Sequence, residues 1–122
     1  MTIAECYQKM GGNYSEVSTR LPSNRLIEKF VFKFLEDKSF EILCGEIENG
    51  NRKEAFRAAH TLKGVCANLS FTRLLQSVTL LTEELRPETD TISDGVTDLF
   101  ANVREDYRIT VNAIHRYMES QG

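Results

Sequence analysis

The chain has 122 residues, the length of one domain, and its 41% hydrophobic and 27% charged residues are the balance of an ordinary globular protein. Its net charge of -3 argues against a nucleic-acid-binding surface. No signal-peptide pattern and no apolar run of roughly 18 residues occurs, which predicts a cytoplasmic protein linked to any membrane only through its partners.

The N-terminal third of the chain is predicted to hold two short helices and one longer helix. Residues 2–10 have a helical apolar spacing and end at Gly11-Gly12, and residues 14–21 form a weaker helical segment. Pro22-Ser23-Asn24 then supplies a break and a cap for a helix over residues 25–36. The apolar stripe of that helix is Ile27, Phe30, Val31 and Phe34.

Two helices are predicted on either side of residue 50. The first follows the joint Asp37-Lys38-Ser39 and ends at Gly50. Its apolar positions are Phe40, Leu43, Cys44 and Ile47. Asn51 begins the second helix, and Glu54, three residues later, completes the pattern of a capping box. This second helix carries His60, one of 2 histidines in the chain.

Two more helices are predicted in the C-terminal half. Ser70 is placed to cap the first of them, and Pro87 ends it. Its apolar residues recur at helical spacing: Leu74, Val78, Leu81 and Leu85. The last helix follows a polar joint and is long enough to run the length of a bundle. Its apolar residues are Ile92, Val96, Leu99, Val103, Tyr107, Ile114 and Met118.

The spacing of these helices predicts the fold class. No segment shows the alternation of a strand, and short joints between amphipathic helices favour antiparallel neighbours. We therefore expect an all-α protein, an antiparallel up-down four-helix bundle over residues 24–120. Residues 1–21 are expected to form an accessory N-terminal segment of one or two short helices. Residues 1–122 together are expected to be a single domain and a monomer.

The helix that carries His60 has an apolar face and an opposite polar face. At about 100° per residue, its apolar side chains fall within about 60° of Leu62. They are Ala55, Ala58, Ala59, Val65, Cys66 and Leu69. His60 lies about 160° from Leu62, and is therefore predicted to face outward. The residues around it are Lys53, Arg57, Gly64 and Ala67, with Lys63 on the flank.

Two interpretations of this outward face are open. A surface histidine on a solvated helix face needs no function. Gly64, however, costs about 1 kcal/mol relative to alanine inside an exposed helix, where no cap or kink requires it. Its compensation would be room for a partner's backbone one turn from His60, while Lys63 could hold an anion against the imidazole. An exposed nucleophile, a cation and a clearance together indicate a histidine that receives a phosphoryl group.

The residues around His60 also resemble a known family. His60-Thr61-Leu62-Lys63-Gly64 is similar to the signature of histidine-containing phosphotransfer (HPt) domains of bacterial multistep phosphorelays. Further segments that fit this family are Ala58-Ala59, Val65-Cys66-Ala67-Asn68-Leu69, Phe34-Leu35-Glu36-Asp37 and Ser39-Phe40. Members of the family often carry glycine where this chain has Ala67 and Ser70.

The resemblance implies a phosphoryl carrier, not an enzyme with its own ATP-binding or kinase domain. His60 would accept the phosphoryl group from a receiver-domain aspartate, or from a hybrid histidine kinase, and a receiver aspartate of a response regulator would take it next. The residues assigned to phosphate stabilisation are Lys63 and Arg57, and those assigned to the approach of the partner are Gly64, Ala67 and Lys53. No cofactor of its own is expected, since the chain offers no acidic site near His60 and Mg²⁺ would belong to the receiver.

Other chemistries lack the residues they need. A metal site in a bundle needs Glu-x-x-His pairs, but Arg57 and Asn112 stand three residues before His60 and His115. Gly-rich phosphate loops and kinase motifs are missing, and Cys66 faces the core without a base for nucleophilic catalysis. Two alternatives stay open: an adaptor bundle that docks onto a receiver or kinase without carrying phosphate, and the phosphoacceptor piece of a larger chemotaxis-type kinase.

Several side chains outside this face have ordinary structural interpretations. His115 lies near the end of the last helix, where an imidazole interacts well with the helix dipole. Phe32 lies off the core stripe, and it either packs beneath the N-terminal segment or is an aromatic anchor for a partner. Cys6, Cys44 and Cys66 cannot all pair, so we expect buried free thiols in a reducing compartment.

Overall fold

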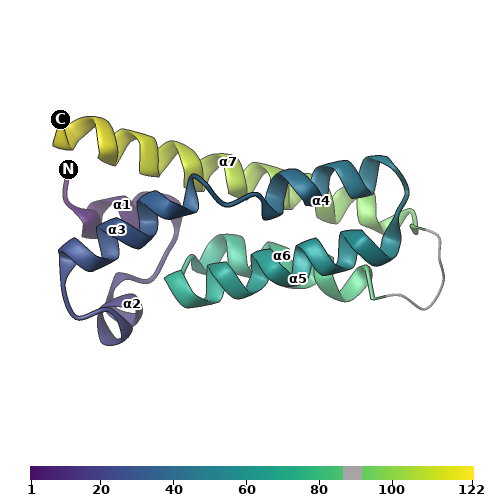
Figure 1. Ribbon diagram of the computed structural model, residues 1–122, viewed down its shortest axis with the longest axis horizontal. Coiled ribbons are helices and arrows are strands. Elements are labelled where there is room, and N and C mark those ends of the chain that lie inside the picture. The colour runs from purple at the N-terminus through teal and green to yellow at the C-terminus, as the bar shows by residue number, and fades with distance from the viewer. Residues whose placement is uncertain (87–91) are drawn as a thin grey trace.

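The computed structural model describes residues 1–86 and 92–122, and every regular secondary-structure element in these ranges is a helix. They are α1 (Ile3–Met10), α2 (Tyr14–Arg20), α3 (Asn24–Phe34), α4 (Ser39–Glu48), α5 (Arg52–Leu69), α6 (Thr72–Glu84) and α7 (Gly95–Gln121). Helices α4 to α7 run alternately up and down, each packed along the next (Figure 1). This confirms the predicted all-α antiparallel bundle. None of the described helices is long and apolar enough to cross a bilayer.

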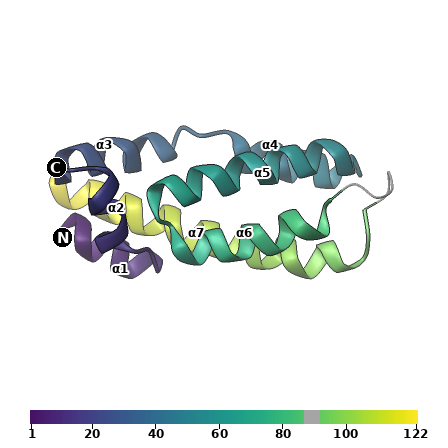
Figure 2. The same cartoon turned by 90° about the horizontal axis from the view of Figure 1, so that it is seen from below.

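The short N-terminal helices lie at one end of the bundle. Helix α3 continues the line of α4 in both views, so the two together form the first arm of the bundle (Figure 1, Figure 2). Helix α1 packs on α7, and α2 lies beside the end of α5. The chain ends meet at this end too, where Gln121 Nε2 donates a 2.9 Å hydrogen bond to the Met1 carbonyl.

Local capping explains where the N-terminal helices begin and end. Thr2 and Glu5 form a capping box, because the Glu5 amide donates to the Thr2 hydroxyl at 3.1 Å and the Thr2 amide donates to the Glu5 carboxylate at 2.8 Å. Gly11 ends α1 with a φ of 75°, in the left-handed region that suits glycine. The Ser23 hydroxyl accepts from the Leu26 amide at 3.1 Å and begins α3, as predicted.

The core contains apolar side chains from each of α1 to α7. The ring of Phe40 in α4 stacks on Tyr107 in α7, with the ring centroids 3.9 Å apart. The Tyr7 hydroxyl of α1 donates a buried hydrogen bond of 2.7 Å to the Leu69 carbonyl at the end of α5. An aromatic pair such as Phe40 and Tyr107 adds about 0.5–1.5 kcal/mol to the stability of the fold beyond the burial of its area. These contacts join segments far apart in the chain and enclose the inner face of α5.

Ser70 does not cap α6, contrary to the prediction. It follows α5 with a φ of 56°, in the left-handed region that residues other than glycine rarely adopt, whereas an N-cap needs extended backbone. The chain turns so tightly here that α6 begins directly after Phe71, without a side-chain cap. The Ser70 hydroxyl instead hydrogen-bonds Glu16 and Arg20 of α2.

The capping box predicted at the start of α5 is half formed. The Asn51 side chain accepts from the Glu54 amide at 3.4 Å. The Glu54 carboxylate, however, accepts from the Arg57 guanidinium at 3.0 Å instead of from the Asn51 amide. The Asn51 amide instead donates to the Glu46 carbonyl at 2.9 Å, so both groups of the missing half of the box have other partners.

Several apolar side chains lie in positions that differ from those predicted from the sequence. Phe30 and Met118, both placed on core stripes, are each 37% exposed. Phe32 is half-buried, and its ring centroid lies 5.9 Å from that of Tyr117, so the ring it packs against belongs to the last helix. Ile92 precedes α7 instead of lying within it. The helix end predicted at Pro87 lies outside the described residues.

All three cysteines are free thiols. Cys6 and Cys66 are buried, and burial raises the pKa of Cys6 to about 11 and that of Cys66 to about 12. Cys44 is half-buried, and burial raises its pKa as well. The expected full burial therefore holds for two of the three thiols.

Candidate functional site

Helix α5 presents His60 to solvent near its middle. The apolar stripe on the other side of the helix is buried at Ala55, Ala58, Ala59, Leu62, Cys66 and Leu69, and half-buried at Val65. His60 is exposed, as the helical period predicts. The neighbouring helices α4 and α6 pack on either side of α5 and leave this strip of the helix uncovered.

The closest aromatic neighbour of His60 is Phe56, one turn earlier on α5. The two ring centroids lie 6.1 Å apart, with 24° between the ring planes. The guanidinium carbon of Arg86 lies 5.7 Å from the centroid of the same Phe56 ring. Phe56 was not assigned from the sequence, although its spacing of four residues from His60 places both side chains on one face.

The cations assigned from the sequence differ in how far their charge is balanced. Arg57 is exposed and paired with Glu54, so part of its charge is neutralised. Lys53 is exposed and forms no ion pair with the residues that the structure describes. Both lie on the exposed strip that carries His60, where they add positive field.

Lys63 lies on the side of α5 that borders α6. It is half-buried and forms no ion pair within the described ranges 1–86 and 92–122. The hydrogen bond from Arg86, followed by the charges of Arg86 and Lys63, lowers the pKa of Glu83 in α6. Lys63 is therefore near enough to Glu83 for its charge to act on that carboxyl, yet it is not held in an ion pair with it.

Gly64 leaves open space one turn after His60. A Cβ added to Gly64 would meet no atom within 4 Å, and Ala67, three residues on, is exposed. Packing within the chain therefore gives no reason for glycine in this helix, where it costs about 1 kcal/mol relative to alanine. A side chain at this position would extend into open space.

The exposed strip can carry nucleophilic chemistry on a group that another molecule brings. A neutral imidazole has one ring nitrogen with a free lone pair, and an ammonium group such as that of Lys63 is a point charge for phosphate oxygens. In the part of the chain that is described, no group of three or more histidine, cysteine, aspartate or glutamate side chains could hold a metal ion.

Residues 31–106 match the family model of the Hpt domain. The matched segment begins within α3, includes all of α4, α5 and α6, and ends within α7. The chain belongs to the Hpt domain family. Comparisons with curated proteins and with solved structures found no match. Hpt domains are phosphoryl carriers without kinase activity in phosphorelays, and they interact with receiver domains.

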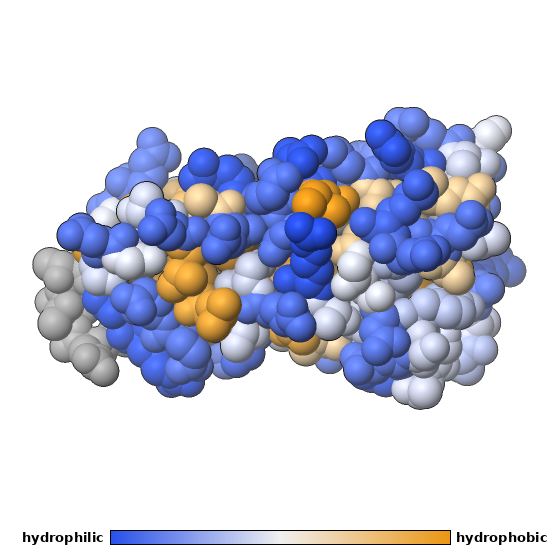
Figure 3. Space-filling view, turned by 180° about the vertical axis from the view of Figure 1, so that it is seen from behind, coloured by the Kyte–Doolittle hydropathy of each residue, from blue (hydrophilic) through white to orange (hydrophobic). Residues whose placement is uncertain are grey.

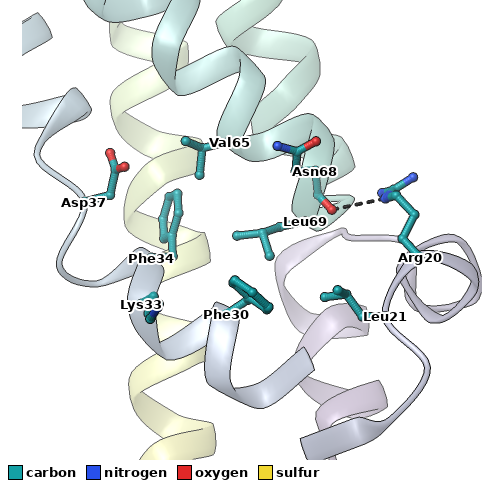
Figure 4. Close-up of a pocket in the computed structure, with 9 residues that line it drawn as sticks. All are labelled: Arg20, Leu21, Phe30, Lys33, Phe34, Asp37, Val65, Asn68 and Leu69. Carbon is teal, nitrogen blue, oxygen red and sulfur yellow. Dashed lines mark hydrogen bonds between the residues drawn. The ribbon is translucent and has the colours of Figure 1, made fainter. Parts of the chain in front are cut away.

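An apolar groove lies beside the His60 helix of this Hpt domain (Figure 4). It has a volume of about 400 Å³, and its apolar lining is Leu21, Phe30, Phe34, Val65 and Leu69. Lys33 and Asp37 of the α3–α4 segment also line it. The sequence did not reveal this groove, because its walls come from helices that are far apart in the chain.

Arg20 closes one end of the groove in Figure 4. Its Nε donates to the Asn68 carbonyl at 3.2 Å, and its Nη2 donates to the Ala67 carbonyl at 3.0 Å. A cation at the last carbonyls of a helix satisfies groups that have no partner within the helix and interacts favourably with its dipole. Arg20 therefore attaches α2 to the C-terminal turn of the His60 helix.

The Hpt domain is largely hydrophilic on the side seen in Figure 3, opposite the view of Figure 1. Outside the grey residues, apolar side chains form small separate groups in this view and no continuous patch. By contrast, the groove beside α5 gathers five apolar side chains next to the strip that carries His60.

Proposed function

We propose that this Hpt domain carries a phosphoryl group on His60 between receiver-domain aspartates, or from a hybrid histidine kinase to a response regulator, in a two-component phosphorelay. The observation that carries the proposal is the exposure of His60 within the segment that matches the Hpt family. Lys63 and the open surface at Gly64 support it, because a phosphoryl group needs a cation and a docked receiver needs room.

In the proposed step, a ring nitrogen of neutral His60 attacks the phosphorus of an aspartyl phosphate on the receiver. An N–P bond forms while the P–O bond to the aspartate breaks, and the aspartate leaves with that electron pair as a carboxylate. The ring keeps the proton on its other nitrogen, and its new positive charge is balanced by the negative phosphoryl oxygens. In the second transfer, the carboxylate of another receiver aspartate attacks the phosphorus. A P–O bond forms, the N–P bond breaks, and His60 returns to its neutral form.

Alignment and charge neutralisation supply most of the rate enhancement in a phosphoryl transfer of this kind. We assign the direct contact with the phosphoryl oxygens to Lys63. Arg57 and Lys53 add a longer-range field, and that of Arg57 is weakened by its pairing with Glu54. The Mg²⁺ that such transfers use would be bound on the receiver side.

The partner is proposed to dock on the strip around Gly64 and Ala67 and to extend onto the apolar groove. Val65 and Asn68 follow Gly64 within about one helical turn, and both line that groove. An apolar side chain of the receiver could therefore bury itself there while the receiver's active site faces His60. In this proposal the protein acts as a monomer in the cytoplasm.

The test is phosphoryl transfer from a purified receiver domain that has been charged with radiolabelled acetyl phosphate and Mg²⁺. The wild-type protein is expected to acquire an acid-labile, base-stable label, and the His60→Gln variant none, although both bind the receiver. Binding without labelling of the wild type would contradict a carrier and support the adaptor that docks without carrying phosphate.

A further inference from the structure

The orientation of the His60 ring is not set by a hydrogen bond to any residue that the structure describes. A neutral imidazole has two tautomers, and in histidines that act in catalysis a hydrogen bond to one ring nitrogen usually selects the tautomer and holds the ring. Another contact must therefore restrict the ring of an exposed histidine that takes part in a transfer with a strict geometry.

The contact that does so is the stack between His60 and Phe56. Side chains four residues apart lie on the same face of a helix, and long side chains lean back toward the N-terminal turn. The His60 ring accordingly lies over the turn that carries Phe56, with 6.1 Å between the ring centroids and 24° between the planes. Near-parallel rings at this distance are offset, so Phe56 touches one side of the His60 ring and the ring stays exposed to solvent.

Phe56 is itself held in place from α6. It packs against the core as a half-buried side chain, and the guanidinium of Arg86 lies over its ring at 5.7 Å. Glu83 fixes that guanidinium through hydrogen bonds of 2.9 Å from Nε and 3.2 Å from Nη2. A chain of contacts thus runs from Glu83 of α6 through Arg86 and Phe56 to the imidazole of His60. Through these contacts α6 restrains the ring of His60 on α5.

We propose that Phe56 is a positioning residue for phosphoryl transfer, which holds the His60 ring with its nitrogen edge pointing away from α5 toward the partner. This role rests on the function proposed above. Phe56 touches neither the phosphoryl group nor the receiver in this proposal, and it acts through the orientation of His60.

The experiment compares Phe56→Leu with Phe56→Tyr, since leucine keeps apolar bulk at this position while tyrosine also keeps the planar ring. Phe32→Leu is the matched control, because it too removes a half-buried ring that packs at a tilt on one aromatic neighbour, Tyr117, but leaves His60 untouched. Two quantities are measured: the three-bond NMR couplings that report the χ1 rotamer of His60 in the unphosphorylated protein, and the transfer rate from a charged receiver at increasing receiver concentration.

Phe56→Leu is expected to average the χ1 couplings of His60 over several rotamers and to lower the maximal transfer rate about tenfold at an unchanged half-saturating concentration. Phe56→Tyr and Phe32→Leu are expected to behave as the wild type does. Unchanged χ1 couplings and an unchanged maximal rate in Phe56→Leu would overturn the proposal, and so would a change in the half-saturating concentration alone, which would assign Phe56 to docking. A wild type that accepts no phosphate would overturn the proposed function and the role of Phe56 in transfer, whereas the NMR comparison decides independently whether Phe56 orients the ring.

Discussion

The Ser70 hydroxyl donates a hydrogen bond of 2.7 Å to the Glu16 carboxylate, so the residue that follows α5 is bound to the short helix α2. Arg20, one turn after Glu16, also bonds the Ser70 hydroxyl and the last carbonyls of α5. The Ser70 hydrogen bond, and more weakly Arg20, lowers the pKa of the Glu16 carboxyl. Helix α2 thereby holds the C-terminal end of α5, the helix that carries His60.

Replacement of Ser70 separates this hydrogen bond from the backbone strain at the same residue. Ser70→Ala is expected to destabilise the fold by about 1 kcal/mol, because it removes the link to Glu16 and Arg20. Ser70→Gly loses the same link but relieves the left-handed φ of 56°, so it should be more stable than Ser70→Ala by about 1 kcal/mol. Urea denaturation of the three proteins measures both differences, and equal stability of the two variants would contradict the assigned strain.

His60 is expected to matter for phosphorylation and not for folding. Because its ring is exposed and makes no hydrogen bond within the described part of the chain, His60→Gln should change the free energy of unfolding by no more than about 0.5 kcal/mol. The same variant should lose acid-labile phosphorylation completely. Thermal melts and transfer assays on one preparation test both expectations, the unchanged stability and the lost phosphorylation. A variant that no longer folds would mean that the ring belongs to the core.

Gly64 is expected to lower the stability of α5 and to leave room for the receiver to approach. Gly64→Ala should stabilise the protein by about 1 kcal/mol, since a Cβ meets nothing within 4 Å and alanine favours the helix. Gly64→Leu should also leave the helix intact but block transfer by filling the surface where the receiver approaches. The melting temperature and the transfer rate of both variants are compared with the same receiver. A Gly64→Leu protein that transfers phosphate at the wild-type rate would refute the clearance argument.

Lys63 is expected to act on the transfer step more than on docking. Lys63→Ala should slow transfer about 10–100-fold, because a cation at the developing charge is lost from the site. Lys9→Ala is the control, since Lys9 is an exposed lysine of α1, outside the strip that carries His60. Titration calorimetry with an uncharged receiver should give similar affinities for all three proteins, and a selective loss of binding in Lys63→Ala would reassign this residue to docking.

Cys66 is expected to make the fold sensitive to alkaline pH. Burial raises the pKa of this thiol to about 12 from its ordinary value of 9.0. Since the folded-state pKa lies above the unfolded value, the thiol stabilises the fold fully below pH 9 and loses this contribution as the pH rises toward 12. The free energy of unfolding should fall by up to about 1.4 kcal/mol per pH unit from this thiol alone.

The variant Cys66→Ala isolates that contribution, because other buried groups titrate in the same range in both proteins. Its unfolding free energy should depend less steeply on pH than that of the wild type between about pH 9 and 11. Urea denaturation at several pH values supplies the comparison. Parallel curves for the two proteins would show that the thiol does not titrate with unfolding.

The helical periodicity of the sequence was enough to predict the bundle and the outward face of α5. A residue's angle around a helix depends on backbone geometry alone, so Leu62 and His60 must point in opposite directions wherever α5 packs. The Ser23 cap was predictable for the same reason, since it depends on residues within one turn. The segment around His60 also carried the family resemblance that the Hpt match confirmed.

The contacts between helices around the His60 strip were decided by the tertiary structure. Arg86, which follows α6, lies over the Phe56 ring, and Phe30 of α3 lines the groove beside α5 and is 37% exposed. Ser70 does not cap α6, because its hydroxyl bonds Glu16 of α2 and its backbone takes the left-handed conformation of the tight turn before α6. Periodicity is a local property of one helix, whereas the choice of which helix borders each flank arises from packing between residues that are far apart in the chain.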